Sequence, residues 1–377
     1  MAQKLKLRSK EQVVAEIETG IKNNINTNYL RGVSMVVDPV IVQTTEEKIR
    51  QSYKFLDMIS TTPTQESSGE ILSLAEGVSI GQRTKVGTNN GNNMRRPIAV
   101  GGFSGRKFET RELELDVKIP WNVITQWGMQ SAAAYDLYRN FILRSRAMAR
   151  LRIGFYGQSE NLAINSDLTT YPLMEDVQKG WFQYMIDNHP QNVFGITMGG
   201  ITAKGYDINP IKIGAGGDFA SMAQLIDYLK NHVMPRIYRA NTAITAIVGD
   251  TLRNADVNRI IDAAGSDAMQ LNAVESLMQM QTIGSIPAYT PDEMPERGVI
   301  VTDPLNLEYI YQLQSVERSI ENSPDKKGLV DYQLQNVDFV IREVNACVMV
   351  HPDAIQLQNS SGTWVAAADA WAISPVV

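Results

Sequence analysis

The sequence contains almost no cysteine and very little histidine. Its 377 residues include one cysteine, Cys347, and three widely separated histidines, His189, His232 and His351. One cysteine cannot form a disulfide within the chain, and a zinc site built from cysteines is excluded. Because metal and general-base sites need clustered groups, we expect no metal site and no histidine-based catalytic site. A Cys347/His351 pair, four residues apart, is the one alternative that the sequence leaves open.

Long hydrophobic runs are missing, and so is an excess of positive charge. No apolar run approaches the roughly 18 residues of a membrane span, and the basic N-terminus lacks the apolar core of a secretory signal. We therefore expect no membrane partner and a soluble protein that stays in the cell that makes it. The formal net charge of −6 argues against a general nucleic-acid-binding protein but leaves room for a basic local face.

Catalytic and nucleotide-binding motifs are also absent, with one near miss. The stretch IKIGAGGDFAS, which begins at Ile211, runs from a strand pattern through a glycine loop into a helix pattern. A dinucleotide-binding loop needs a further glycine at the helix start, and a phosphate-binding loop needs a following lysine. We interpret the loop as a hinge capped by Asp218 or Ser221, and we expect neither an enzyme nor a cofactor. The hinge glycines are Gly214, Gly216 and Gly217.

Helix and strand patterns are mixed along the chain, without an internal repeat. Apolar residues at helical spacing predict helices over 9–28, 45–60, 170–189 and 218–238. A long β segment is predicted over 332–355. This irregular mixture predicts an α+β fold.

Residues 63–120 differ from the rest of the chain. Strand-like ends flank a polar, glycine-rich middle, and the run from 107 to 119 alternates like an exposed two-stranded ribbon. An isolated hairpin is marginal in water, so we expect either an arm that packs on a neighbouring subunit or a long disordered loop. Its candidate inter-subunit cations are Arg95, Arg96, Arg106, Lys107 and Arg111.

The strongest helix signal covers residues 131–157. An apolar stripe runs along this segment, and no acidic residue occurs between 137 and 159. Two interpretations of its basic face stay open: pairing with acidic groups elsewhere or solvent, or contact with a polyanion. The arginines of this face are Arg139, Arg144, Arg146, Arg150 and Arg152.

Several blocks of sequence in a fixed order resemble one known family. They are VDPVIVQTTEEKIRQSYKFLDMIS (37–60), YPLMEDVQKGWFQY (171–184), IKIGAGGDFASMAQLI (211–226), IVGDTL (247–252), IGSIPA (283–288) and IENSPDKKGLVDYQLQNVDFVIREVNACVMV (320–350). Together they resemble the Peduovirus (P-two-like) major capsid proteins of tailed bacteriophages, which have the Hong Kong-97-type fold.

The resemblance implies a domain organisation. The glycine loop would connect two lobes, and the long helix would be the spine helix of one of them. The implied parts are an N-terminal arm (1–62), an extended E-loop ribbon (63–120), a peripheral P-domain (121–215) with its spine helix (131–157), an axial A-domain (216–315), a return to the P-domain (316–358) and a C-terminal tail (359–377).

The resemblance also implies a function. The chain would assemble with itself as hexamers and pentamers into an icosahedral shell, in the cytoplasm of the bacterial host. Its partners would be a portal protein, a scaffolding protein that carries a protease, packaged double-stranded DNA and, as an open point, a decoration protein. A nanocompartment shell and a nucleotide-binding enzyme are the less favoured alternatives. The tail extends past the family pattern, and we expect Trp364 and Trp371 to anchor it on the same or a neighbouring subunit.

Overall fold

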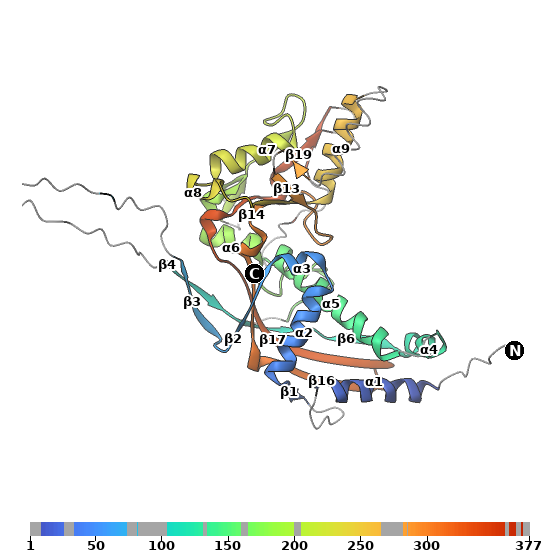
Figure 1. The fold of residues 1–377 in the computed structure, drawn as a ribbon. Coiled ribbons are helices and arrows are strands. Elements are labelled where there is room, and N and C mark those ends of the chain that lie inside the picture. Colours follow the sequence, from blue (N-terminus) through green and yellow to red (C-terminus); the bar gives the residue numbers. More distant parts are fainter. Residues whose placement is uncertain are drawn as a thin grey trace, which may run out of the picture.

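The computed structural model describes residues 9–25, 34–73, 81, 104–130, 134–159, 165–199, 205–264, 282–284, 286–358, 362–366 and 371. These residues form an elongated body, which carries the longest helix and the longest strand, and a second lobe above it (Figure 1). The helices are α1 (Lys10–Ile25), α2 (Pro39–Gln51), α3 (Lys54–Met58), α4 (Trp121–Gln130), α5 (Ala134–Tyr156), α6 (Trp181–Asn188), α7 (Met222–Tyr228), α8 (Arg236–Arg239) and α9 (Asp250–Ala264).

A seven-stranded sheet forms the base of the body, with the 14-residue strand β17 (Gly328–Ile341) at its centre. One edge of β17 pairs in succession with β16 (Glu317–Ser323) and β15 (Leu307–Gln312), and its other edge pairs with β6 (Val117–Pro120) and β5 (Arg111–Glu114). All four pairings are antiparallel. The outer strands of this sheet are β1 (Met35–Val36) and β2 (Ser60–Thr64).

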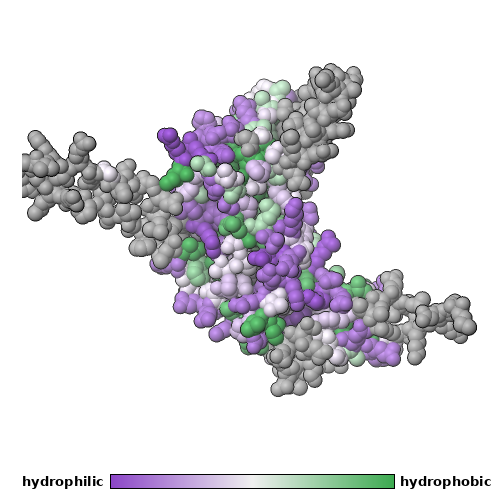
Figure 2. Space-filling model, viewed as in Figure 1, coloured by the Kyte–Doolittle hydropathy of each residue, from purple (hydrophilic) through white to green (hydrophobic). Residues whose placement is uncertain are grey.

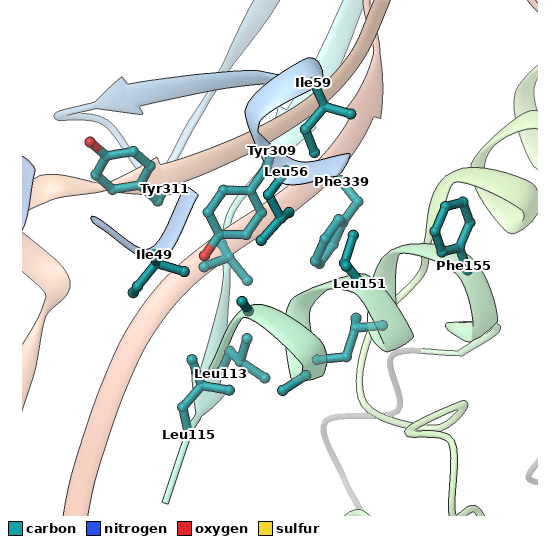
Figure 3. Close-up of a cluster of buried hydrophobic side chains, with 14 of the residues drawn as sticks. Ile49, Leu56, Ile59, Leu113, Leu115, Leu151, Phe155, Tyr309, Tyr311 and Phe339 are labelled. Atoms are coloured by element: carbon teal, nitrogen blue, oxygen red, sulfur yellow. The ribbon is translucent and has the colours of Figure 1, made fainter. Parts of the chain in front are cut away.

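The first hydrophobic core lies between this sheet and the helices α1 to α6. Side chains of α5, including Leu151 and Phe155, gather with Phe339 of β17 and Tyr309 of β15 (Figure 3). Phe55 of α3 packs against Phe155 with ring centroids 5.5 Å apart. Helix α1 adds its apolar stripe to the same core. The stripe residues Val13, Val14, Ile17 and Ile21 are all buried.

A six-stranded sheet separates this core from a second one. In the order of the sheet, its strands are β12 (Thr282–Ile283), β13 (Ile286–Tyr289), β11 (Thr245–Val248), β14 (Val299–Thr302), β18 (Val348–Val350) and β7 (Val193–Phe194). Because side chains alternate along a strand, the two faces of the sheet enter different cores. Ile247, Ile300 and Met349 belong to the first core. Ala246, Val301 and Val350 belong to the second, beside α7.

Three small sheets complete the described chain. The three-stranded sheet contains β10 (Ile211–Ile213), β19 (Ile355–Gln358) and β20 (Trp364–Val365). A two-stranded ribbon, β3 (Ser68–Ser73) with β4 (Ser104–Glu109), leaves the body, as Figure 1 shows. A second pair is formed by β8 (Ile196–Met198) and β9 (Tyr206–Ile208).

Helices α5 and α6 approach each other through glycines. A Cβ on Gly180, at the start of α6, would lie 2.4 Å from the carbonyl oxygens of Ile153 and Gly154. A Cβ on Gly154 would lie 2.6 Å from the ring of Trp181. The absence of a side chain at both positions therefore lets Trp181 enter the core, where its Nε1 donates to the Glu308 carbonyl at 3.3 Å.

The structure confirms the α+β class and the long helix, and it corrects two local expectations. The ribbon predicted over 63–120 is shorter, because β5 and β6 join the main sheet and bury Leu113 and Ile119. The helix predicted over 170–189 begins only at Trp181. Met174 has a positive φ of 65°, which is incompatible with a continuous helix through the preceding residues.

The α5–α6 contact generates a first prediction. Gly180→Ala should lower the free energy of unfolding by about 1–3 kcal/mol, because the added methyl group meets backbone and cannot be accommodated by a side-chain rotation. Urea unfolding of the full chain measures the change. Gly81→Ala is the matched control, since its Cβ meets no described atom within 4 Å. Equal stability of the two variants would contradict this account of the contact.

Candidate assembly surfaces

Two of the arginines predicted to form a basic face on α5 lie inside the body. Arg146 and Arg150 have side chains that are 1% and 3% exposed. Arg150 binds both carboxylate oxygens of Glu46 on α2, and its Nη2 donates to Glu46 Oε1 at 2.7 Å. Gln335 and the ring of Tyr309 complete its surroundings. The bidentate geometry compensates for the desolvation of both charges.

Asp331 is the second buried acid beneath α5. Its oxygens accept from Arg318 Nε at 2.9 Å, from Arg318 Nη2 at 2.6 Å and from the Tyr138 hydroxyl at 2.6 Å. Arg146 Nη2 lies 3.4 Å from Asp331 Oδ1. Burial alone would raise the pKa of Asp331, but the charges of Arg318 and Arg146 outweigh it, so this pKa lies below its ordinary value.

The other three arginines of α5 have different surroundings. Arg152 Nε donates to Glu293 at 2.7 Å, which ties α5 to the segment that precedes β14. Arg139 is half-buried and Arg144 is exposed. The five arginines therefore do not share one solvent face. Acid pairing accounts for Arg150 and Arg152, Arg146 shares Asp331 with Arg318, and Arg139 and Arg144 keep part or most of their surface exposed.

The partners of the buried arginines were missed by the sequence analysis, although a signal exists. Every second residue of β17 from Leu329 to Ile341 is buried. Asp331, Gln333 and Gln335 occupy this inward row between apolar neighbours. Polar residues at inward positions of a strand need buried partners, and two arginines four residues apart on one helix can supply them.

The ribbon presents the predicted inter-subunit cations only in part. Arg95 and Arg96 lie outside the described residues, and for Arg106 only the backbone, paired with Ile71, is described. Lys107 is exposed, and Arg111 Nη2 lies 2.9 Å from Glu109.

The base of the ribbon is held by two backbone N–H groups. Thr110 N donates to Ser67 O at 2.8 Å, and Glu109 N donates to Asp338 Oδ2 at 2.9 Å.

The glycine loop is a closed turn inside the second lobe. Gly214 and Gly216 have φ of 147° and 76°, and a Cβ on Gly217 would lie 2.6 Å from the Lys212 carbonyl. Asp218 does not cap the helix, because its carboxylate accepts from Lys212 N at 2.9 Å and closes the loop. Ser221 is the N-cap and accepts from Gln224 N. Strand β10 and helix α7, on either side of the loop, share the second core, so the loop lies within one lobe.

The tail returns to its own chain through both tryptophans. Trp364, in β20, is half-buried and covers the glycine loop, with its ring 2.8 Å from the position of a Cβ on Gly217. Trp371 is 2% exposed and donates from Nε1 to the Phe155 carbonyl at 2.9 Å. Its ring packs on Phe182 and on the edge of His351. The tail therefore contacts both lobes of the same subunit.

Among the described residues, no group of three or more His, Cys, Asp or Glu side chains could hold a metal ion. Burial raises the pKa of Cys347 to about 12, so its thiol stays protonated. His351 does not pair with it: its Nδ1 accepts from Asp353 N at 3.2 Å, and its Nε2 lies 3.2 Å from the Tyr206 hydroxyl. Among the helices of the described ranges, none is long and apolar enough to span a membrane.

The comparisons with known proteins show which proteins this chain resembles. A protein named "Capsid proteins" of Escherichia phage P2 is 26% identical over 317 residues, covering 83% of this chain and 85% of that protein. The major capsid protein of Serratia phage KSP20 is 24% identical over 311 residues, covering 81% and 85%. A chain in the structure titled "Satellite phage P4 procapsid including size determination (Sid) protein" has 22% identity and a TM-score of 0.69, covering 91% of this chain and 98% of that one.

The fold is therefore that of a Hong Kong-97-type phage capsid protein. The family model described as phage major capsid protein, P2 family, matches residues 14–352. The chain belongs to this family of structural capsid proteins. The domain boundaries expected at 215/216 and 315/316 differ from the division of the two cores, because β10 lies in the second core and β15 in the first.

The ion pairs beneath α5 generate a prediction about pH. Asp331→Asn should lower the free energy of unfolding by about 3–5 kcal/mol at pH 7, because Arg146 and Arg318 would lose their shared acid. The folded pKa of Asp331 is depressed. Its contribution is therefore complete above the unfolded value of about 3.9 and is lost as pH falls through the folded value.

Urea unfolding of wild type and variant between pH 3 and pH 7 measures this difference. The difference in the free energy of unfolding between wild type and Asp331→Asn should become smaller toward pH 3. Asp57→Asn is a control, since the Asp57 side chain is 58% exposed and pairs only at the surface. A gap that stayed constant with pH would show that the charge of Asp331 is not what stabilises the cluster.

The tail contacts generate a third prediction. Trp371→Ala should destabilise the subunit by about 3–5 kcal/mol, because it leaves a cavity between α5, α6 and His351. Trp364→Ala should cost less, since Trp364 is only half-buried. Thermal unfolding of both variants gives the comparison, and a larger loss for Trp364→Ala would refute the assignment of Trp371 as the main anchor.

Proposed function

We propose that the chain is a shell subunit that assembles as hexamers and pentamers into an icosahedral capsid around double-stranded DNA. The match to the capsid family over residues 14–352 carries this proposal. The ribbon of β3 and β4 supports it, because a two-stranded element that leaves the body needs a surface to cover it. In this proposal the ribbon is the E-loop, which lies over an adjacent subunit.

The two lobes receive roles on the same basis. The body with spine helix α5 is the peripheral P-domain, and the lobe around α7 is the axial A-domain that gathers at the symmetry axes. The buried ion pairs connect the helices and the sheet of the body into one unit, and a shell subunit needs this because forces on the shell are distributed over all its subunits. Exposed apolar side chains on both lobes are candidates for subunit contacts, and green patches are visible on the surface in Figure 2. The exposed apolar side chains include Val40, Phe141, Ile237 and Leu305.

The proposed partners follow from the capsid assignment. They are further copies of the chain, a portal protein, a scaffolding protein that carries a protease, packaged DNA and a decoration protein. The particle would be assembled in the cytoplasm of the bacterial host. Of the α5 arginines, we propose Arg139 and Arg144 for contact with an anionic partner at the surface, because Arg150 and Arg152 pair with acids of the same chain and Arg146 is buried. A net charge of −6 is compatible with a shell around DNA, since packaging is driven by a motor.

No observation favours the two alternatives. A nanocompartment shell would share the fold, but the family match is to phage capsid proteins. A nucleotide enzyme would use the glycine loop, where Asp218 is oriented back to Lys212 N and Trp364 covers Gly217.

Electron microscopy of the full chain, expressed alone and with its neighbouring genes, tests the proposal. We expect closed shells, or hexameric and pentameric rings. A small oligomer of uniform size under both conditions would overturn the container function.

The ribbon offers a sharper test within the same experiment. Gly69 and Phe108 are paired across the ribbon, so an Asn-Gly turn can replace residues 70–107 and keep the base intact. This variant should fold with unchanged circular dichroism and urea sensitivity but should form no closed shells, because the contact over the adjacent subunit is lost. Normal shells from the shortened chain would show that the ribbon is not an assembly element.

A further inference from the structure

A partly open cavity of about 190 Å³ lies between α1, α2, α5 and β16. A single water needs about 10–15 Å³ on the same measure, so the cavity has room for a larger polar ligand. Apolar side chains such as Val42 and Ile142 form part of its wall. Its charged lining consists of four cations and one acid, Glu46, which is paired with Arg150: the cations are Lys48, Arg139, Arg146 and Arg318.

Arg146 is the group in this wall that lacks a proper acceptor. Its side chain is 1% exposed, yet Nε and Nη2 have no hydrogen-bond partner among the described residues. The distance of 3.4 Å from Nη2 to Asp331 Oδ1 is an ion pair without hydrogen-bond geometry. A buried guanidinium with unused donors is costly, because the donors have lost water and gained nothing in exchange.

The acids nearby are already engaged by other groups. Asp331 accepts from Arg318 and Tyr138, and Glu46 accepts from both terminal nitrogens of Arg150. Burial lowers the pKa of Arg146 to about 10, and the opposing effect of Asp331 is smaller. Neither acid therefore fully compensates the positive charge of Arg146.

Arg146 also lines a second hollow of different character. That groove is lined by acids that would repel an anion. They are Glu112, Glu114, Asp116 and Asp176. An anion that satisfies Arg146 must therefore come from the cavity beside α2, where three further cations line the wall.

We propose that this cavity binds a small oxyanion of the phosphate class, with Arg146 as its main ligand. Three acceptor oxygens and a planar guanidinium fork match in geometry and charge. The cavity of about 190 Å³ has room for a free ion but not for the backbone of a nucleic acid, so the ligand is a free ion. The bound ion stabilises the packing of α2 on α5.

Thermal unfolding of the full chain in inorganic phosphate, against chloride at equal ionic strength, tests the proposal. A ligand that binds the folded chain alone should raise the Tm of wild type by about 2 °C or more at saturating phosphate. Arg146→Met should lose this shift, because it removes the guanidinium and keeps the side-chain length. Arg152→Gln is the matched control on the same helix: it pairs with Glu293 outside the cavity and should keep the shift.

Two further measurements keep the test decisive if Arg146→Met folds poorly. Thr45→Leu, at a half-buried position in the cavity wall, should fill the space and abolish the shift while Arg146 stays in place. An oligonucleotide at the same phosphate concentration should give no shift in Tm that depends on Arg146. The proposal is overturned by no phosphate shift in wild type, by a full shift in either cavity variant, or by equal protection from the oligonucleotide.

Discussion

The body of this protein depends on the ion pairs buried between α5 and its neighbours. Arg150 with Glu46, and Arg318 with Asp331, bring together α2, α5, β16 and β17, which are far apart in the sequence. A single charge left in this interior would cost several kcal/mol, so each partner is tolerable only when the others are in place. The apolar core shown in Figure 3 then forms around a fixed register between helix and sheet.

The second constraint is the six-stranded sheet that belongs to both cores. Its alternating side chains are buried on either face, so the two lobes cannot rotate against each other without breaking a packed core. Trp371 adds a further connection, because it packs on α6 and on His351 and donates to the Phe155 carbonyl at the end of α5. The glycine loop, in contrast, is closed on itself by Asp218 and lies within one lobe. The rigid unit thus carries its extension, the β3–β4 ribbon, at one edge.

Sequence reasoning succeeded where local pattern decides the structure. The 3.6-residue period predicted α5. It failed where two structures fit one local pattern. The alternation from Arg111 to Pro120 suits a solvated ribbon and a half-buried strand equally, and only pairing with β17 decides between them. Asp218 and Ser221 are both good caps, and the choice between them depended on the Lys212 amide that Asp218 reaches.

By itself the sequence determined the α+β class, the long basic helix and the membership in a capsid family, because these depend on periodicity, composition and ordered blocks of residues. Only the tertiary structure decided which arginines of that helix are structural. Burial and pairing of Arg146 and Arg150 depend on Glu46 and Asp331, which lie about a hundred or more residues away, and the local pattern that marks Asp331 as inward-facing does not say which residue it pairs with. Electrostatic energy depends on distance and on the exclusion of water, and both are set by packing.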